Sequence, residues 1–316
     1  MKVICTSPSF AKHSNKPIIR LQQEGIELVR VPPDISQAEF VQEAKGAEAA
    51  IVAFNKISDA VLAQLPDLKV VAKHGVGVDN IDVAAAKKHG VIVTNVPNAN
   101  KHAVADFAFS LLLSLARQIP SGTDITKKGE WPSLFGADVY QQTLGIIGLG
   151  AIGKEVARRA SGFAMNVLAY DPYIDRTYAD QNGIEAVSLE ALLQQSDFVT
   201  VHIPLLPATR HLIGERELQL MKKSAYLVNA SRGGIVDETA LYEALQTQQL
   251  AGAALDVFEK EPLYKSPLFS LDSFIAMPHV AGYTPGAINT LSHTCVDQII
   301  AVLKGKGDLI HVVSGP

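Results

Sequence analysis

One titratable ring, His279, stands in the stretch SFIAMPHVAGYT, residues 273 to 284, directly after a short apolar run. Pro278 ends that run as a strand candidate, because proline has no N–H to donate to a neighbouring strand. Histidine titrates near neutral pH and can therefore carry a proton in a reaction. A lone histidine at a strand end is more often a structural residue, so its role depends on the groups that the fold brings near it.

Two further apolar runs end in charged side chains. AYLVNASRGG carries Arg232 before two glycines, and AGAALDVFEKEPL carries Asp256, Glu259 and Glu261 before a proline. The planar fork of arginine can grip a carboxylate through two parallel hydrogen bonds, which lysine cannot do. Taken alone, Arg232 could equally be a surface ion-pair residue. Because open α/β sheets bind ligands at the carboxyl edge of their strands, the three strand ends predict a site with a cation, carboxylates and an imidazole.

A glycine pattern indicates the cofactor. TLGIIGLGAIGKEVARR places Gly148, Gly150 and Gly153 in a G-x-G-x-x-G between an apolar strand and a helix, whose N-terminus can face a pyrophosphate. Asp171 ends the next apolar run, at close to the roughly 20 residues expected of the acid that binds the ribose hydroxyls. Its carboxylate would repel a 2′-phosphate and so favours NAD over NADP, although Arg176 could soften that preference. The alternative is that Asp171 merely starts the DPY turn.

The elements that must position these residues alternate along the chain. Short, mostly unalternating apolar runs such as AAIVAF, DFVTVHIP and AYLVNAS are typical of strands buried on both faces of a parallel sheet. Helical periods such as AIGKEVARRASGF and DETALYEALQTQQ lie between them, several with Asp, Ser or Gly at their ends as caps. This alternation of strand and helix predicts an α/β fold.

Residues 98 to 119, NANKHAVADFAFSLLLSLARQI, predict one long and largely apolar helix, followed by an irregular segment. A helix that is apolar on most faces must be buried, either between domains or against another subunit. At 316 residues the chain is also long for a single core, since cores stop growing at about 250 to 300 residues. We therefore expect two packed domains.

Composition narrows the class of partner and the location. Hydrophobic residues make up 47% of the chain and charged residues 19%, which is ordinary for a globular protein. A net charge of −4 with scattered basic residues argues against nucleic acid, and no apolar segment reaches the roughly 20 residues of a membrane span. The N-terminus has no signal-peptide core. Cys5 and Cys295 lack metal-ligand spacing, so we expect no metal, two buried free thiols and a cytoplasmic location.

The order of these motifs resembles that of the D-2-hydroxyacid dehydrogenases, the family that includes the D-3-phosphoglycerate dehydrogenases. The resembling segments extend from about residue 50 to 290 and include KHGVGVDNIDV, GLGAIG, YDP, VHIPLLPATRHLI, LVNASRGGIVDETAL, ALDVFEKEP and PHVAGYT. The resemblance implies that Arg232 binds the substrate and that His279 is the acid/base. It also implies that Glu261, and not Glu259, orients the imidazole, which would favour its protonated form.

The resemblance further assigns the contacts around this centre. Backbone N–H groups of the loop formed by Gly75, Val76 and Gly77 would hold the substrate carboxylate, with Lys73 beside them. Asp256 would contact the nicotinamide amide. Further cofactor contacts would come from Ile152, Pro204, Thr209, Ala230 and Gly282. Two residues depart from the family pattern: Leu206 stands where Thr is frequent, and Asp106 stands where Glu is commoner.

The fold implied by the resemblance is a pair of Rossmann-like, doubly wound parallel sheets. A discontinuous substrate-binding domain would comprise residues 1–98 and 287–316, and an NAD-binding domain would comprise residues 99–286. The long helix and the Trp131 loop would build a homodimer. Because the sequence stops after GDLIHVVSGP, we expect no regulatory domain of the kind that some phosphoglycerate dehydrogenases append.

The expected reaction is hydride transfer between NAD and a small D-2-hydroxyacid or 2-oxoacid, with His279 exchanging the proton. We favour 3-phosphoglycerate and 3-phosphohydroxypyruvate as the pair, although the loop after AAIVAF lacks the arginine that phosphoglycerate dehydrogenases often place there. Lys56 and Lys73 could meet a phosphate as point charges. Glyoxylate, hydroxypyruvate or another small 2-oxoacid is the alternative. A second class also stays open, because NAD-binding corepressors without turnover resemble this fold and keep similar residues.

Overall fold

The structure is a computed structural model that describes residues 1–315. The chain divides into two compact units, of which unit 1 comprises Met1–Asn100 with the segment from Tyr283 on, and unit 2 comprises Lys101–Gly282. The joins predicted from the sequence, after residues 98 and 286, lie within a few residues of these. The two sheets described next confirm the predicted α/β class.

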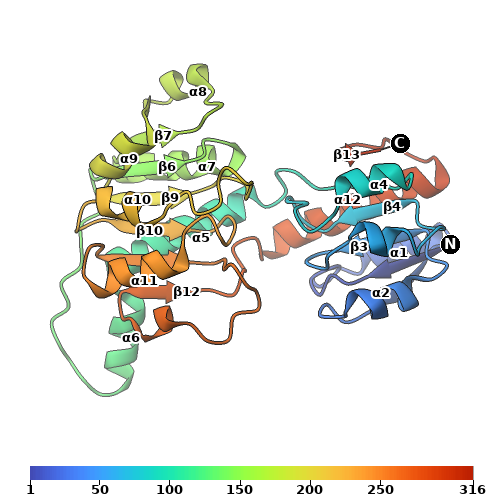
Figure 1. The fold of residues 1–316 in the computed structure, drawn as a ribbon, viewed down its shortest axis with the longest axis horizontal. Helices are drawn as coiled ribbons and strands as arrows, with labels where there is room; N and C mark the ends of the chain where they lie inside the picture. Colours follow the sequence, from blue (N-terminus) through green and yellow to red (C-terminus); the bar gives the residue numbers. More distant parts are fainter. Residues whose placement is uncertain (316) are drawn as a thin grey trace. The chain divides into compact units, whose positions relative to one another are not determined.

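Unit 1 is built on a six-stranded sheet with the strand order β13-β5-β4-β3-β1-β2 (Figure 1). Its strands are β1 (Lys2–Cys5), β2 (Glu27–Arg30), β3 (Ala49–Val52), β4 (Val70–Lys73), β5 (Ile92–Thr94) and β13 (Val312–Ser314). All pairs are parallel except β13 with β5. The helices of this unit are α1 (Lys16–Gln23), α2 (Gln37–Ala44), α3 (Asp59–Leu62), α4 (Val83–Lys88) and α12 (Pro285–Lys304).

Two cores, one on each face, explain why unit 1 is discontinuous in sequence. Every residue of β3 and β4 is buried, so both faces of these strands need a cover. Side chains of α2, α3 and α4 pack on one face. On the other face, α12 supplies Ile288, Leu291 and Val296 beside Leu21 of α1. Helix α12 therefore returns to complete a core that the first 100 residues leave half covered.

Unit 2 is built on a seven-stranded parallel sheet with the order β12-β11-β10-β9-β6-β7-β8. Figure 1 shows β7 above β6 and β12 lowest in the stack. The strands are β6 (Thr143–Ile147), β7 (Asn166–Tyr170), β8 (Ile184–Ala186), β9 (Phe198–Val201), β10 (Tyr226–Asn229), β11 (Gly252–Leu255) and β12 (Phe274–Ala276). The strand order reverses at β6, and the carboxyl end of such a strand is where open α/β sheets bind ligands.

The helices of unit 2 cover both faces of its sheet. One core contains α5 (Lys101–Ala116) and α7 (Ala151–Ala160), and the other contains α9 (Leu189–Gln195), α10 (Glu215–Leu220) and α11 (Glu238–Gln246). The unit is completed by α6 (Ile119–Lys127), α8 (Arg176–Gln181) and the short 3₁₀ helices η1 (Ser161–Phe163) and η2 (Pro267–Ser270).

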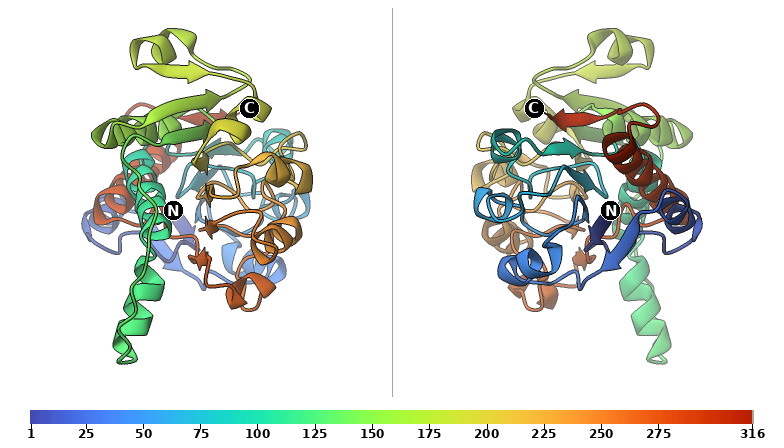
Figure 2. Two further views of the ribbon diagram at one scale, coloured as in Figure 1. Left: turned by 90° about the vertical axis from the view of Figure 1, so that its left-hand side faces the viewer. Right: turned by 90° about the vertical axis from the view of Figure 1, so that its right-hand side faces the viewer.

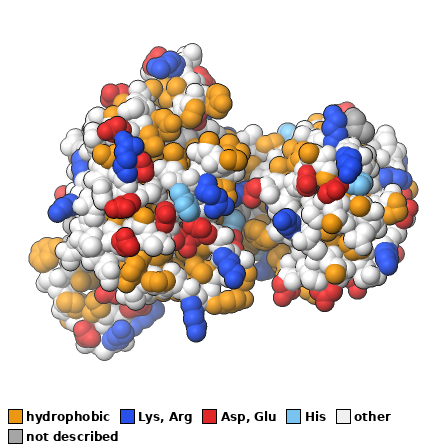
Figure 3. Space-filling model, in the orientation of Figure 1, with side chains coloured by type: hydrophobic (Ala, Val, Ile, Leu, Met, Phe, Trp, Pro, Cys, Tyr) orange, Lys and Arg blue, Asp and Glu red, His pale blue; other side chains and the backbone are white. Residues whose placement is uncertain are grey.

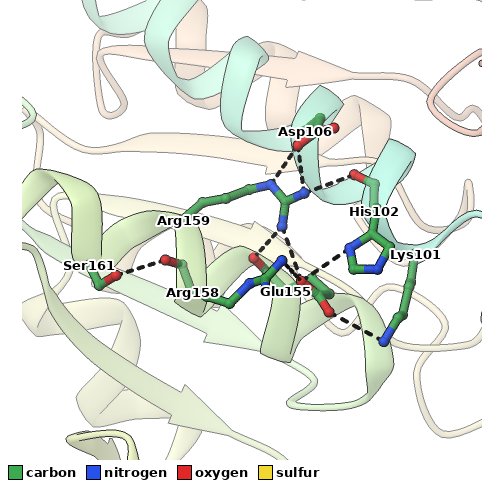
Figure 4. Close-up of polar contacts among 7 residues, drawn as sticks. All are labelled: Lys101, His102, Asp106, Glu155, Arg158, Arg159 and Ser161. Atoms are coloured by element: carbon green, nitrogen blue, oxygen red, sulfur yellow. Dashed lines mark hydrogen bonds and ion pairs between the residues drawn. The ribbon is translucent and has the colours of Figure 1, made fainter.

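Polar contacts join α5 to α7 (Figure 4). Arg159 Nε donates to Asp106 Oδ1 at 2.7 Å, and its Nη1 donates to the Glu155 carbonyl at 2.7 Å. Glu155 lies 3.2 Å from both Lys101 Nζ and His102 Nδ1. Asp106, one of the two departures from the family pattern, is thus a partner of Arg159 that fixes α7 against α5.

The predicted long helix over residues 98–119 is present as α5, but the segment after it, which we expected to be irregular, begins with a second helix, α6. Helix α5 ends at Ala116, Gln118 has a φ of 50° in the left-handed region, and α6 starts at Ile119 with a proline in its first turn. A left-handed residue cannot continue a right-handed helix, so the chain bends there. Within the described residues no single helix is long and apolar enough to cross a membrane, and α5 and α6 pass that test only as a pair bent by 60°.

Helix α6 has no buried residue and extends away from the rest of unit 2 (Figure 2). Apolar side chains gather over this region in the space-filling view (Figure 3). The most exposed of them follow α6, with Trp131 90% and Phe135 86% exposed, and Ile119 begins the helix half exposed. This apolar surface includes the Trp131 loop, to which the family resemblance gave a role in a dimer.

Candidate active site

The three glycines of the fingerprint each have a different reason to lack a side chain. Gly148 has a φ of 98°, and a Cβ there would lie 2.6 Å from the carbonyl oxygen of His202. A Cβ on Gly153 would lie 2.1 Å from the carbonyl oxygen of Gly148. Gly150, the N-cap of α7, faces open space, since a Cβ there would meet nothing within 4 Å. The turn therefore presents the N-terminus of α7 to a ligand.

A cavity of about 680 Å³ opens at this turn. Four residues of the predicted cofactor set line it, and these are Gly150, Asp171, Pro204 and Thr209. Asp171 is held from two sides, because Leu149 N–H donates to its Oδ2 at 3.0 Å and Tyr173 N–H donates to its Oδ1 at 2.9 Å. A helix N-terminus and an oriented carboxylate in one cavity suit the pyrophosphate and ribose of a dinucleotide.

The loop after β9 also lines this cavity. Thr209 Oγ1 accepts the N–H of Leu206 at 2.7 Å and donates to the carbonyl of Pro204 at 2.7 Å, which closes the loop into a turn. Leu206, the other departure from the family pattern, lines the cavity with an exposed apolar side chain. His202 also lines it, and burial lowers the pKa of this histidine to about 4, so it is neutral at physiological pH.

Arg232 follows β10, in a loop that is fixed by hydrogen bonds of Asn229 and by close packing at Gly233. The buried side chain of Asn229 donates to the carbonyl of Arg232 at 2.9 Å and accepts the N–H of Ser231 at 3.0 Å. A Cβ on Gly233 would lie 1.9 Å from the carbonyl oxygen of Phe258. The two glycines after Arg232 thus let its loop press against the loop that carries Glu261.

His279 and Glu261 meet at the carboxyl ends of β12 and β11. His279 Nδ1 lies 2.7 Å from Glu261 Oε2, while Glu261 Oε1 accepts the N–H of Phe258 at 2.9 Å. Glu259 points elsewhere, with its Oε1 2.9 Å from His211 Nε2. The structure therefore pairs His279 with the glutamate before the proline, as the family resemblance implied.

Asp256 is fully buried beneath the turn that carries His279. Its two carboxylate oxygens accept the N–H groups of Val280 and Ala281, each at 2.8 Å, and its carbonyl accepts the N–H of His279 at 2.8 Å. Burial raises the pKa of Asp256, and these two backbone hydrogen bonds oppose that rise. The geometry gives Asp256 a part in holding the turn, and its contact with the nicotinamide amide stays a prediction.

The remaining residues of the predicted cofactor set lie outside the cavity lining. Ile152 is in the first turn of α7, between the second and third glycines of the fingerprint. Ala230 is buried directly after β10, and Gly282 is the last residue of unit 2. Their contacts with the cofactor also stay predictions.

In unit 1, the loop of Gly75, Val76 and Gly77 follows β4. Asn95 Nδ2 donates to the carbonyl of Val76 at 2.6 Å, and Val96 N–H donates to the carbonyl of Gly75 at 3.0 Å. Among the described residues, the N–H groups of Val76 and Gly77 have no hydrogen-bond partner. A braced loop with two available amides suits an anion.

Lys73 is only 8% exposed, and protein oxygens engage its ammonium group. Nζ donates to Asn80 Oδ1 at 2.6 Å and to the carbonyl of Ala53. Its stem packs on the loop, since a Cβ on Gly75 would lie 3.2 Å from Lys73 Cε. Lys73 therefore ties the loop of Gly75 to the segment after β3.

Two residues that sequence reasoning left without a role help to build this centre. Asn229 shapes the Arg232 loop, and an Asn-x-Ser after a buried strand is a recognisable signal for such a side-chain-closed turn. His211 lies between two loops, with Nε2 2.9 Å from Glu259 Oε1 and Nδ1 3.5 Å from Asp237 Oδ2. No local pattern in the sequence marks His211, because its partners come from distant segments.

Comparison with known proteins supplies the family. Residues 109–281 match the model of the D-isomer specific 2-hydroxyacid dehydrogenase, NAD binding domain. The chain is 41% identical to a D-3-phosphoglycerate dehydrogenase of Methanocaldococcus jannaschii over 97% of its own length, but spans only 58% of that relative. It is also 41% identical to a glyoxylate reductase of Korarchaeum cryptofilum, over 87% of this chain and 85% of that one.

Solved structures agree with these relatives. The TT0316 protein from Thermus thermophilus superposes with a TM-score of 0.90 at 33% identity, over 99% of this chain and 100% of that one. A D-lactate dehydrogenase from Aquifex aeolicus, complexed with NAD and lactic acid, superposes with a TM-score of 0.87 at 29% identity over the full length of both chains. NAD is the cofactor that the matched domain takes. This chain belongs to the D-isomer-specific 2-hydroxyacid dehydrogenase family.

Proposed function

We propose that the chain is an NAD-dependent D-2-hydroxyacid dehydrogenase, which interconverts a small 2-oxoacid and the matching D-2-hydroxyacid. The observation that supports this most is the 2.7 Å contact between His279 Nδ1 and Glu261 Oε2, in a loop that packs against the Arg232 loop. A histidine oriented by a carboxylate is the arrangement that general acid–base catalysis requires.

In the reduction, His279 is the proton donor. Its Nδ1 is occupied by Glu261, so Nε2 is the ring atom from which the proton passes to the carbonyl oxygen of the substrate. The carboxylate of Glu261 stabilises the imidazolium before the transfer and holds the ring in one orientation. The negative charge that develops on the substrate oxygen is thereby neutralised.

We expect two sets of groups to bind the substrate carboxylate. Arg232 carries a planar fork on a loop fixed by Asn229, and its Nη1 also donates to the carbonyl of Ser231 at 2.7 Å. The loop of Val76 and Gly77, to which the family resemblance gives the same role, has two amides without a partner among the described residues. When it is bound, reduced NAD supplies the hydride that the carbonyl carbon takes up.

For the substrate, we now favour an unphosphorylated 2-oxoacid such as glyoxylate or hydroxypyruvate. Lys73 was one of two lysines that could meet a phosphate, and Asn80 and Ala53 engage its ammonium group. A glyoxylate reductase is among the relatives at about 40% identity. The second candidate, 3-phosphohydroxypyruvate, is supported by the relatives named D-3-phosphoglycerate dehydrogenase and by Lys56, which is located in the loop after β3.

The oxidation of NADH against a panel of 2-oxoacids tests this proposal. We expect kcat/KM for glyoxylate or hydroxypyruvate to exceed that for 3-phosphohydroxypyruvate, with little loss on addition of salt. A phosphorylated substrate preferred by the parent, and lost in Lys56→Ala, would instead support the second candidate. Absence of turnover with every 2-oxoacid, with NADH still bound, would support the non-catalytic corepressor class.

We also propose a homodimer, built through α6 and the exposed apolar segment that follows it. The exposed side chains of Ile119, Trp131 and Phe135 form an apolar surface of the kind that marks subunit contacts. We separately propose a cytoplasmic location. Cys5 and Cys295 are free and buried thiols, as is usual for proteins of a reducing compartment.

A further inference from the structure

The cavity beside the glycine turn already contains a cation. Lys154 directly follows Gly153 in the first turn of α7 and lines the cavity together with Asp171 and Asp175. A cation in this position bears on the choice between NAD and NADP, which differ only by a 2′-phosphate on the adenosine ribose.

The start of α8 holds Lys154. Its Nζ lies 2.9 Å from Asp175 Oδ2 and 4.1 Å from the centroid of the Tyr178 ring. Asp175 is the N-cap of α8, and its Oδ1 accepts the N–H of Tyr178 at 3.1 Å. The hydrogen bond from Lys154 lowers the pKa of Asp175, which keeps this carboxylate charged. One carboxylate therefore caps the helix and pairs with the lysine.

The charges in the cavity are unfavourable for a second phosphate. Asp171 and Asp175 contribute two negative charges, and the single positive charge of Lys154 is paired with one of them. The Asp171 carboxylate would repel a 2′-phosphate on the ribose. Lys154 would not offset this repulsion, because it is already paired with Asp175. Arg176 is exposed at the first position of α8 and is not among the residues that line the cavity.

We propose that Asp175 is a second determinant of the preference for NAD over NADP, because it holds Lys154 away from the position of a 2′-phosphate. The proposal rests on the assignment of the cavity to the adenosine end of the cofactor. Asp171 repels the phosphate directly. Asp175 acts indirectly, because it binds Lys154, the cation of the cavity lining, and so keeps Lys154 from pairing with the phosphate.

This arrangement predicts that the two aspartates act non-additively. When Asp175 alone is neutralised, the released Lys154 can pair with Asp171, which lines the same cavity. When Asp171 alone is neutralised, Lys154 stays with Asp175. Only the loss of both carboxylates leaves the ammonium group to a phosphate, so the double variant should gain more than the product of the single effects.

The test compares dissociation constants of NADH and NADPH, measured from nicotinamide fluorescence without any substrate. The variants are Asp171→Asn, Asp175→Asn and the double variant, since asparagine also caps helices well and should leave α8 intact. We expect the ratio of the NADPH to the NADH dissociation constant to fall by roughly tenfold in Asp171→Asn, by about twofold in Asp175→Asn, and by roughly 100-fold or more in the double variant. NADPH affinity of the double variant should weaken as salt is added.

Two further substitutions in the double background identify the cation. Lys154→Met should cancel the additional gain in NADPH affinity and change NADH affinity little, whereas Arg176→Ala, the matched control, should leave the gain in place. Independent effects of the two aspartates, or a gain that depends on Arg176 and not on Lys154, would overturn the proposal. It also falls if Asp171→Asn leaves NADH affinity unchanged, because the cavity is then not the ribose site. Turnover assays of the His279 proposal are independent of all these results.

Discussion

Replacement of Glu261 by glutamine tests the carboxylate–histidine pair with the smallest change in shape. The parent carboxylate accepts on both sides, from Phe258 N–H at 2.9 Å and against His279 Nδ1 at 2.7 Å. A glutamine has one oxygen and one NH₂ group for these two positions. If the oxygen stays with Phe258, the NH₂ group faces the Nδ1–H of the imidazolium. If the amide turns over, its NH₂ group faces the Phe258 N–H.

In either orientation two N–H donors face each other without an acceptor. The substitution also removes the negative charge beside the imidazolium. A group left without its hydrogen-bond partner costs about 1 to 3 kcal/mol when buried. Because the His279 and Glu261 side chains are 29% and 30% exposed, water relieves part of that cost. We therefore take about 1 to 2 kcal/mol, which corresponds to a roughly 5- to 30-fold fall in kcat for reduction.

The assay is NADH oxidation at saturating 2-oxoacid, with the dissociation constant of NADH measured separately. Glu259→Gln is the matched control, because Glu259 lies in the same loop but contacts His211. We expect Glu261→Gln to lose turnover with NADH affinity kept, and Glu259→Gln to lose much less. An unchanged kcat in Glu261→Gln, or an equal loss in both variants, would refute the assigned partner.

Three further predictions concern stability, cofactor binding and assembly. Burial lowers the pKa of His74 from 6.5 to about 3. As the pH falls below about 6.5, the unfolded chain therefore takes up a proton that the folded chain does not. The free energy of unfolding then decreases until the pH approaches 3. In His74→Asn, the slope of the unfolding free energy between about pH 4 and 6 should fall by about 1.4 kcal/mol per pH unit, and an unchanged slope in denaturant titrations would contradict this. Gly153→Ala should weaken NADH binding at least about tenfold, because its Cβ would lie 2.1 Å from the Gly148 carbonyl oxygen; an unaltered titration would show that the turn is not the cofactor site. Trp131→Ser with Phe135→Ser should convert a dimer to a monomer in sedimentation velocity, and a parent that is already monomeric would rule out the proposed assembly.

Local patterns were sufficient to predict the strands and the glycine turn. Runs such as AAIV in β3 are buried at every position. An unbroken apolar run of this kind is therefore enough to predict a strand that is covered on both faces of the sheet. Helix α6 could not be predicted in the same way. None of its residues is buried, so packing leaves no mark on its sequence, and the left-handed backbone of Gln118 separates it from α5.

The candidate site shows the same division. The family resemblance assigned the role to Glu261 and not Glu259, because Glu261 precedes Pro262, and the structure puts Glu261 at His279. Lys73 looked available for a phosphate because its acceptors are non-local, with Ala53 and Asn80 reached only through the fold. The pairing of Lys154 with Asp175 was hidden for the same reason, since the two residues come from different parts of unit 2.

The role of His279 as proton donor is tested most directly by the variant His279→Ala. Its turnover is measured with NADH and the preferred 2-oxoacid, and its NADH dissociation constant is measured separately. If His279 donates the proton, kcat falls by roughly 10² to 10⁴, which is what positioned acid–base catalysis supplies, and NADH affinity stays nearly unchanged. Turnover equal to that of the parent would show that His279 is not the proton donor.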